Sequence, residues 1–205
     1  MNLIFLPMIK KNESQFTLMA FIGLIFISIV STLLFVSLNK KPVEYTEAIA
    51  ESIELIKSFA ENKEIVNELK VANEEHSDLT NEEILRMDAE WRSTDVTSKQ
   101  KIDLHSNEAS AFLVEIQNME PKFAEIFITD SYGLNIAQTN VTTDYYQADE
   151  SWWVEAYDNG VGYYGNIEFD ESAQKWSVPI YTRLEDENEE VIGVVKALLD
   201  TSKIR

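Results

Sequence analysis

The sequence has no cysteine and little glycine, proline or positive charge. Its 205 residues include six glycines and four prolines, and 17 basic residues are outnumbered by 36 acidic ones, for a net charge of −19. Without cysteine the chain has no disulfide, no thiolate metal ligand, no cysteine nucleophile and no lipidated cysteine. The negative charge argues against nucleic acid and anionic lipid surfaces as partners, because both would repel it. The acidic composition therefore indicates neutral or cationic partners, or serves only to keep the protein soluble.

Motifs of enzymes, cofactor sites and metal sites are also missing. The chain has no G-x-S-x-G, kinase or phosphate-loop motif, and its two histidines, His76 and His105, lack metal-ligand spacing. Residues 160–165 match G-x-G-x-x-G, but a helix is expected before them and a strand after them, the reverse of a dinucleotide site. The acidic run 185–190 lacks the pattern of a calcium loop and predicts a solvated turn. We therefore expect no catalysis, no cofactor and no metal.

One long uncharged run is present at residues 16–38, bracketed by lysine pairs at 10–11 and 40–41. At about 1.5 Å per residue it spans roughly 35 Å, enough to cross a bilayer. A cleaved signal peptide and a buried helix are the alternatives, but a signal peptide has a shorter apolar core and small residues at its cleavage site. The flanking lysines do not decide the orientation. The acidic remainder favours a short cytoplasmic segment at 1–15 and an extracytoplasmic part from residue 39 onward.

An apolar stripe at helical spacing runs through residues 42–74, formed by Tyr45, Ile49, Ile53, Ile56 and Ala60. This stripe predicts a long helix that packs either on the protein's own core or on a second copy, which would give a homodimer through residues 42–73. Shorter helices are expected at about 81–92 and 106–119, each after a capping pattern. Residues 39–120 are thus expected to form an extracytoplasmic helical region.

After Pro121 the pattern changes to alternation, which is typical of strands. Strands are expected at about 123–129, 134–137, 163–169, 175–183 and 191–199, and a short helix at about 150–158. Because short polar turns join the strands, we predict an α+β fold in which residues 121–205 form a five-stranded antiparallel sheet flanked by helices.

Aromatic side chains gather between residues 144 and 176. Rings with a few polar groups are typical of small-ligand pockets, and rings beside carboxylates suit a cation. The candidate ligand-binding residues are Asp144, Tyr145, Glu150, Trp152, Trp153, Tyr163, Tyr164 and Trp176. Alternatively, Trp152 and Trp153 pack the short helix on the sheet, one in the core and the other at its rim.

Three runs, Phe127–Gly133, Thr139–Trp153 and Ile192–Val195, resemble the extracytoplasmic Cache sensor domains of bacterial and archaeal receptors. The resemblance covers about Pro42–Arg205. It implies a PAS-like five-stranded sheet carried by a long membrane-proximal helix. It also implies a small ligand between the sheet, the short helix and its loops, and a signal that passes to the membrane through the long helix.

The ligand class implied by the resemblance depends on one motif. Amino-acid-binding members have an Arg-x-Trp-Tyr pattern whose arginine helps to hold the ligand carboxylate. Here the equivalent residues are Glu150-Ser151-Trp152-Trp153, which places Glu150 at the arginine position. We therefore expect a neutral or cationic ligand, with Glu150, Asp144 or Asp149 as the counter-charge.

Taken together, these features predict a sensor domain that is anchored in the plasma or inner membrane by a single span and binds a small solute without catalysis. The first alternative is an anchored structural or interaction module that dimerises through its membrane-proximal helix, and the second is an anchored hydrolase. The chain ends at Arg205 without an output domain. A missing second module and a separate receptor partner both stay open.

Overall fold

The computed structural model describes residues 22, 43–160, 162–171 and 173–204. The predicted membrane helix over residues 16–38 and the predicted cytoplasmic segment 1–15 lie outside these residues, apart from Ile22. Within the described part, no helix combines the length and the apolar character needed to cross a bilayer.

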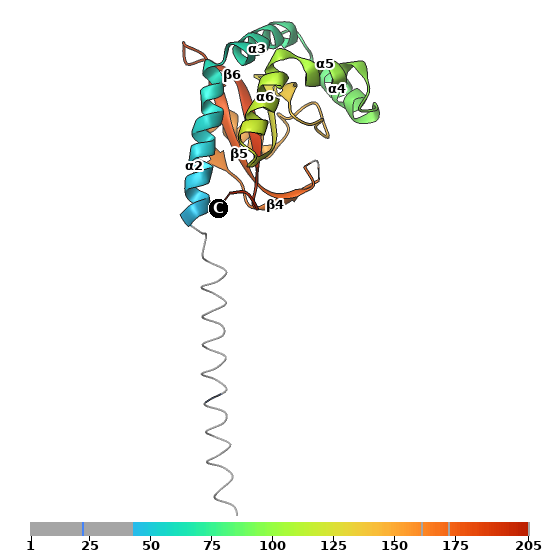
Figure 1. Cartoon of the computed structure of the whole chain (residues 1–205). Helices are drawn as coiled ribbons and strands as arrows, with labels where there is room; N and C mark the ends of the chain where they lie inside the picture. Colours follow the sequence, from blue (N-terminus) through green and yellow to red (C-terminus); the bar gives the residue numbers. More distant parts are fainter. Residues whose placement is uncertain (1–21, 23–42, 161, 172, 205) are drawn as a thin grey trace, which may run out of the picture. The chain divides into compact units, whose positions relative to one another are not determined.

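The first half of the described chain is helical, as predicted (Figure 1). The helices are α2 (Val43–Lys57), the 3-10 turn η1 (Ser58–Glu61), α3 (Lys63–His76), α4 (Asn81–Ser93), α5 (Lys99–Ser106) and α6 (Glu108–Met119). The predicted long helix is thus divided into α2 and α3. Asn62 has an extended backbone at the division, and its side chain accepts a hydrogen bond from the Ile65 N–H, which starts α3. The capping box predicted at Thr80 is present at the start of α4.

The second half forms one antiparallel sheet in the order β2-β1-β6-β5-β3, with β4 also paired to β5. The strands are β1 (Phe123–Asp130), β2 (Asn135–Gln138), β3 (Tyr163–Tyr164), β4 (Glu168–Asp170), β5 (Lys175–Glu185) and β6 (Val191–Asp200), with helix α7 (Ser151–Asn159) after β2. The α+β class, the antiparallel sheet and the flanking helices are confirmed for the described residues. They match the fold implied by the Cache resemblance.

One predicted strand, over residues 163–169, is divided into β3 and β4. Gly165, Asn166 and Ile167 lie between the paired stretches, opposite Val178 and Pro179 of β5. Proline has no N–H to donate to a neighbouring strand, so a ladder is readily interrupted beside it. The Gly165 N–H still donates to the Pro179 carbonyl at 2.8 Å. Six strands therefore occupy the five predicted positions.

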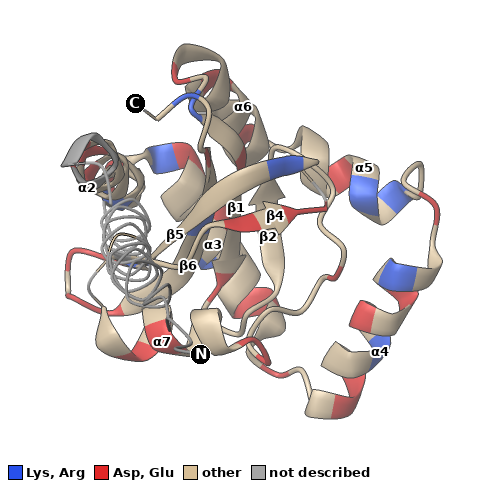
Figure 2. Cartoon of the chain, turned by 90° about the horizontal axis from the view of Figure 1, so that it is seen from below, with Lys and Arg blue, Asp and Glu red and all other residues tan. Residues whose placement is uncertain are grey.

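The three isoleucines of the apolar stripe are buried within the same chain. Ile49, Ile53 and Ile56 belong to the core that α2, α3 and α6 form with one face of the sheet, together with Ile180 and Val195. This is the first of the two predicted alternatives. Helix α7 lies on the other side of the strands from α6, and α4 and α5 extend from one side of the sheet (Figure 2).

The carboxylate of Asp200, at the end of β6, is expected to make the stability of the fold depend on pH. Burial raises its pKa, but hydrogen bonds from Ser202 and Lys175 outweigh burial and bring the pKa down to about 2. Because the pKa is about 3.9 in an unfolded chain, the carboxylate stabilises the fold above that value, and the stabilisation disappears as the pH falls toward 2. We expect the free energy of unfolding of wild type to be about 1–2 kcal/mol larger than that of Asp200→Asn near neutral pH. Urea unfolding should show this gap closing in acid, and a gap that does not change with pH would contradict the assignment.

Candidate functional site

The face of the sheet beneath α7 carries an unusual charged side chain. Lys196 lies in the middle of β6, and its directly paired neighbours are Phe127 on β1 and Tyr181 on β5. Since side chains alternate along a strand, all three leave the sheet on the side opposite the α2 core. Val195 and Ala197, on either side of Lys196, belong to that core.

Trp152 of α7 completes an aromatic cage around the Lys196 ammonium. The Nζ atom is 4.7 Å from the centroid of the Trp152 ring and 5.8 Å from those of Phe127 and Tyr181. The Trp152 ring stacks on Tyr181 at 5.1 Å and meets Phe127 edge-on at 5.9 Å. Each distance is within the range in which a cation is attracted to a ring face. We call Phe127, Trp152, Tyr181 and Lys196 the Lys196 cage.

Carboxylates surround this cage. Burial lowers the pKa of the Lys196 ammonium, while the negative charges of Asp170, Glu168, Glu125 and Glu150 oppose that shift. The ammonium is therefore held in a site that is apolar in its walls and acidic at its edges.

A small cavity of about 70 Å³ adjoins the cage. It is lined by Glu125, Phe127, Thr142, Thr143, Asp144, Gln147, Asp170 and Lys196. Glu125 is buried on β1, whereas Asp144 comes from the loop after β2, where its Oδ1 accepts hydrogen bonds from Gln147 and Thr143 at 3.0 Å. Three carboxylates and one ammonium thus meet at the cavity, so the net charge of its lining is negative.

The two tryptophans of α7 have different positions. Trp153 is buried, stacks on Tyr157, and donates from Nε1 to the Thr129 hydroxyl at 2.8 Å. Trp152 is half-buried at the cage. Trp153 therefore packs α7 on the sheet, whereas Trp152 lies against the Lys196 ammonium at the rim. The ligand-binding role of Trp152 stays a prediction.

The other predicted ligand-binding residues do not all gather at the cage. Asp144 lines the cavity. Glu150 is exposed just before α7, and its negative charge favours the charged form of Lys196. Tyr145 lies in a separate cluster and stacks on Trp91 at 5.3 Å, where burial raises the pKa of its hydroxyl. Tyr164 and Trp176 are exposed. The side chain of Tyr163 is outside the described part of the structure.

Five residues of the cage and its cavity are not among the predicted ones: Glu125, Phe127, Asp170, Tyr181 and Lys196. The sequence does contain a signal, because Glu125 and Lys196 interrupt the apolar runs of β1 and β6. A charged residue in the middle of a buried strand needs a partner or a function. The residues that lie beside such a side chain on the neighbouring strands, however, depend on strand register, which the sequence does not show.

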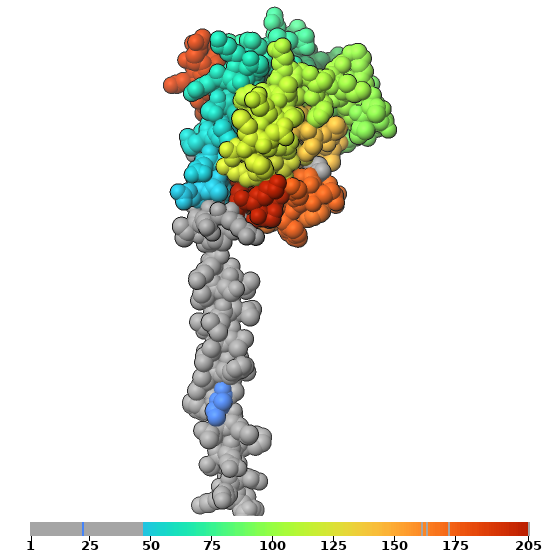
Figure 3. All heavy atoms as spheres, in the orientation of Figure 1, coloured from blue at the N-terminus to red at the C-terminus, as the bar shows by residue number. Residues whose placement is uncertain are grey.

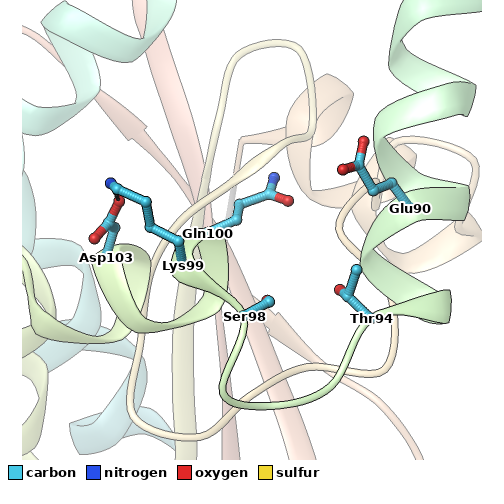
Figure 4. Close-up of a pocket in the computed structure, with 6 residues that line it drawn as sticks. All are labelled: Glu90, Thr94, Ser98, Lys99, Gln100 and Asp103. Carbon is cyan, nitrogen blue, oxygen red and sulfur yellow. Dashed lines mark hydrogen bonds and ion pairs between the residues drawn. The ribbon is translucent and has the colours of Figure 1, made fainter.

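A larger groove of about 450 Å³ lies between the end of α4 and the start of α5 (Figure 4). Its lining residues are Glu90, Thr94, Ser98, Lys99, Gln100 and Asp103. None of them is aromatic, and Lys99 pairs with Asp103. The groove therefore lacks the apolar walls of a small-ligand site, and the cage remains the better candidate.

Comparisons with known proteins give similarities in structure only. No protein-family model and no curated protein matches the chain. Among solved structures, the sensor domain of Escherichia coli DcuS is similar, with 16% identity and a TM-score of 0.35 over 60% of this chain and 90% of that one.

Two further structures are similar over more of this chain. The sensory domain of the Campylobacter jejuni chemoreceptor Tlp3 with isoleucine bound shows 10% identity and a TM-score of 0.41, over 80% of this chain and 65% of that one. The extracellular domain of vpHK1S-Z8 shows 8% identity and a TM-score of 0.48, over 78% of this chain and 54% of that one. This chain thus matches less than two thirds of either structure.

Proposed function

We propose that this chain is a membrane-anchored, extracytoplasmic sensor domain that binds a small neutral or cationic solute at the Lys196 cage, without catalysis. Residues 16–38 would cross the membrane once, 1–15 would be cytoplasmic, and the helical region 39–120 and the sheet domain 121–205 would lie outside. The observation that carries the proposal is the cage: three aromatic rings around an ammonium, beside carboxylates, under a short helix.

The preference for a cation follows from what the cage already holds. Rings and carboxylates that accommodate the Lys196 ammonium would accommodate the ammonium of a ligand by the same forces. A cationic ligand would take the place of Nζ between the rings, and Lys196 would turn toward the cavity, where Glu125 and Asp170 provide counter-charges. Lys196 would thus be the resident cation of the ligand-free domain.

Ligand entry would move the parts that cover the cage. The cavity of about 70 Å³ holds only a few waters, so a larger solute requires displacement of α7 or of the loop that carries Asp144. Tyr181 of the cage and Ile180 of the α2 core are adjacent on β5 and face opposite sides of the sheet. A shift at the cage can therefore reach α2, and through it the proposed anchor.

Ligand binding can be tested on the full chain in lipid nanodiscs by thermal shift and calorimetry. Tetramethylammonium and methylammonium are the cationic probes, and acetate is the anionic one. A probe at 100 times its dissociation constant adds about 2.7 kcal/mol of stability. We expect the cations to raise the melting temperature and acetate to leave it unchanged.

Two variants make this test specific. Trp152→Ala should abolish the shift because it removes the ring nearest to the cation. Trp176→Ala is the matched control and should keep the full shift, since Trp176 is exposed and belongs neither to the rings around Lys196 nor to the cavity lining. Stabilisation by acetate alone, lost in Lys196→Met, would refute the cationic preference and leave an anion sensor. A flat response to every probe would favour an interaction module.

A further inference from the structure

Three large apolar side chains are exposed together at β4 and the start of β5. Ile167, Phe169 and Trp176 are 56%, 46% and 59% exposed. Phe169 and Trp176 are directly paired across the two strands, and their rings meet at 5.7 Å. We call these three residues the Trp176 patch. An exposed cluster that includes a tryptophan indicates a contact surface.

The patch lies at the end of the domain where α2 begins. The carbonyl of Trp176 accepts hydrogen bonds from the N–H and the hydroxyl of Thr201, close to the end of the chain, and the neighbouring Lys175 pairs with Asp200 at 2.9 Å. Figures 1 and 3 show the start of α2, the last residues of the chain and the β4 region at this same end.

We infer that the Trp176 patch rests in the headgroup region of the bilayer, an inference that depends on the proposed membrane anchor. Only four residues, 39–42, separate the predicted membrane segment from α2. Four residues extend at most about 14 Å, so the proposed anchor would keep this end of the domain close to the membrane surface. Tryptophan is favoured there because its ring is apolar while its N–H finds polar partners.

The charges beside the patch restrict the lipid. Glu168 and Glu171 are exposed next to Phe169, and anionic headgroups would repel them. The surface therefore suits zwitterionic lipid such as phosphatidylcholine.

The test uses the full chain in phosphatidylcholine nanodiscs, with and without bromine on the acyl chains near the headgroups. Bromine quenches tryptophan fluorescence at contact. The chain has four tryptophans. Trp176→Phe therefore shows how much of the fluorescence quenching comes from Trp176, and Trp152→Phe is the matched control. We expect wild type and Trp152→Phe to be quenched by brominated lipid, and Trp176→Phe to lose most of that quenching. Adding anionic phosphatidylglycerol to the discs should reduce the quenching of wild type.

Other results would overturn the inference. Equal quenching of wild type and Trp176→Phe, in a chain that remains in the discs, would place the patch away from lipid. Trp176 shielded from both bromolipid and aqueous acrylamide would assign the patch to a contact with a second copy. Recovery of the chain in the aqueous fraction after detergent removal would instead refute the anchor itself, and the two failures are therefore distinguishable.

Discussion

Replacing Asp88 by alanine is expected to destabilise the domain by about 2–4 kcal/mol. Asp88 is buried on α4, and its Oδ1 accepts hydrogen bonds from the backbone N–H groups of Tyr145 at 2.9 Å and Tyr146 at 3.1 Å. Its Oδ2 pairs with Arg92. The substitution leaves two backbone donors without this acceptor, one of them in a buried hydrogen bond and the other in a partly buried one. Leaving a buried donor unsatisfied costs about 1–3 kcal/mol.

The measurement is urea unfolding of the full chain, with two variants for comparison. Glu90→Ala changes an exposed residue on the same helix, so its effect should stay within about 0.5 kcal/mol. Asp88→Asn retains an acceptor oxygen and should fall between wild type and Asp88→Ala. If Asp88→Ala unfolds like Glu90→Ala, the two backbone donors have other acceptors and α4 is not held through Asp88.

This contact also links the outlying helices to the proposed site. Asp88 holds the backbone of Tyr145, next to Asp144, which lines the cavity. The carbonyl of Asp144 is held in turn by the amide of Asn135 at 2.9 Å. Loss of Asp88 should therefore weaken binding of a cationic probe as well as stability, because the loop that covers the cavity loses its support.

Elements with local signals were predictable from the sequence. Thr80 and Glu83 form a capping box by themselves, and the turn after β1 is fixed by Asp130, whose Oδ1 accepts from the N–H groups of Tyr132 and Leu134. Gly133 has a positive φ of 84°, which glycine adopts without strain. Each signal depends on residues a few positions apart, so no tertiary information was needed.

The site was only partly predictable because it depends on register. Aromatic density pointed to Trp152 of the cage, but it pointed equally to Tyr145, which packs on α4, and to Trp176, which is exposed. The cage forms because strand pairing places Phe127 and Tyr181 on either side of Lys196. These three residues are far apart in the sequence, and a shift by one residue in either strand would turn the ring to the other face.

Trp153→Ala is expected to cost more stability than Trp152→Ala, whereas Trp152→Ala is expected to cost more binding. Trp153 is 6% exposed and donates to Thr129, so its loss should cost about 3–5 kcal/mol through the cavity left behind. Trp152 is half-buried, and its loss should cost about 1–2 kcal/mol. For binding of the cationic probe, we expect the larger loss with Trp152→Ala. Trp152→Ala removes a wall of the cage, whereas Trp153→Phe, which keeps most of the packing, should still bind the probe.

Urea unfolding and calorimetry with tetramethylammonium on the same variants measure both effects. Trp153→Phe removes the hydrogen bond to Thr129 but keeps an aromatic ring, so it should cost about 1 kcal/mol for the lost bond plus a smaller cavity cost than Trp153→Ala. If Trp152→Ala binds the probe as wild type does while every Trp153 variant fails to bind, the ligand is held on the Trp153 side of α7 instead. The Lys196 cage would then be a structural cation site. If the Trp153 variants lose mainly stability and Trp152→Ala loses mainly binding, then Trp153 fixes α7 to the sheet and Trp152 contacts the ligand.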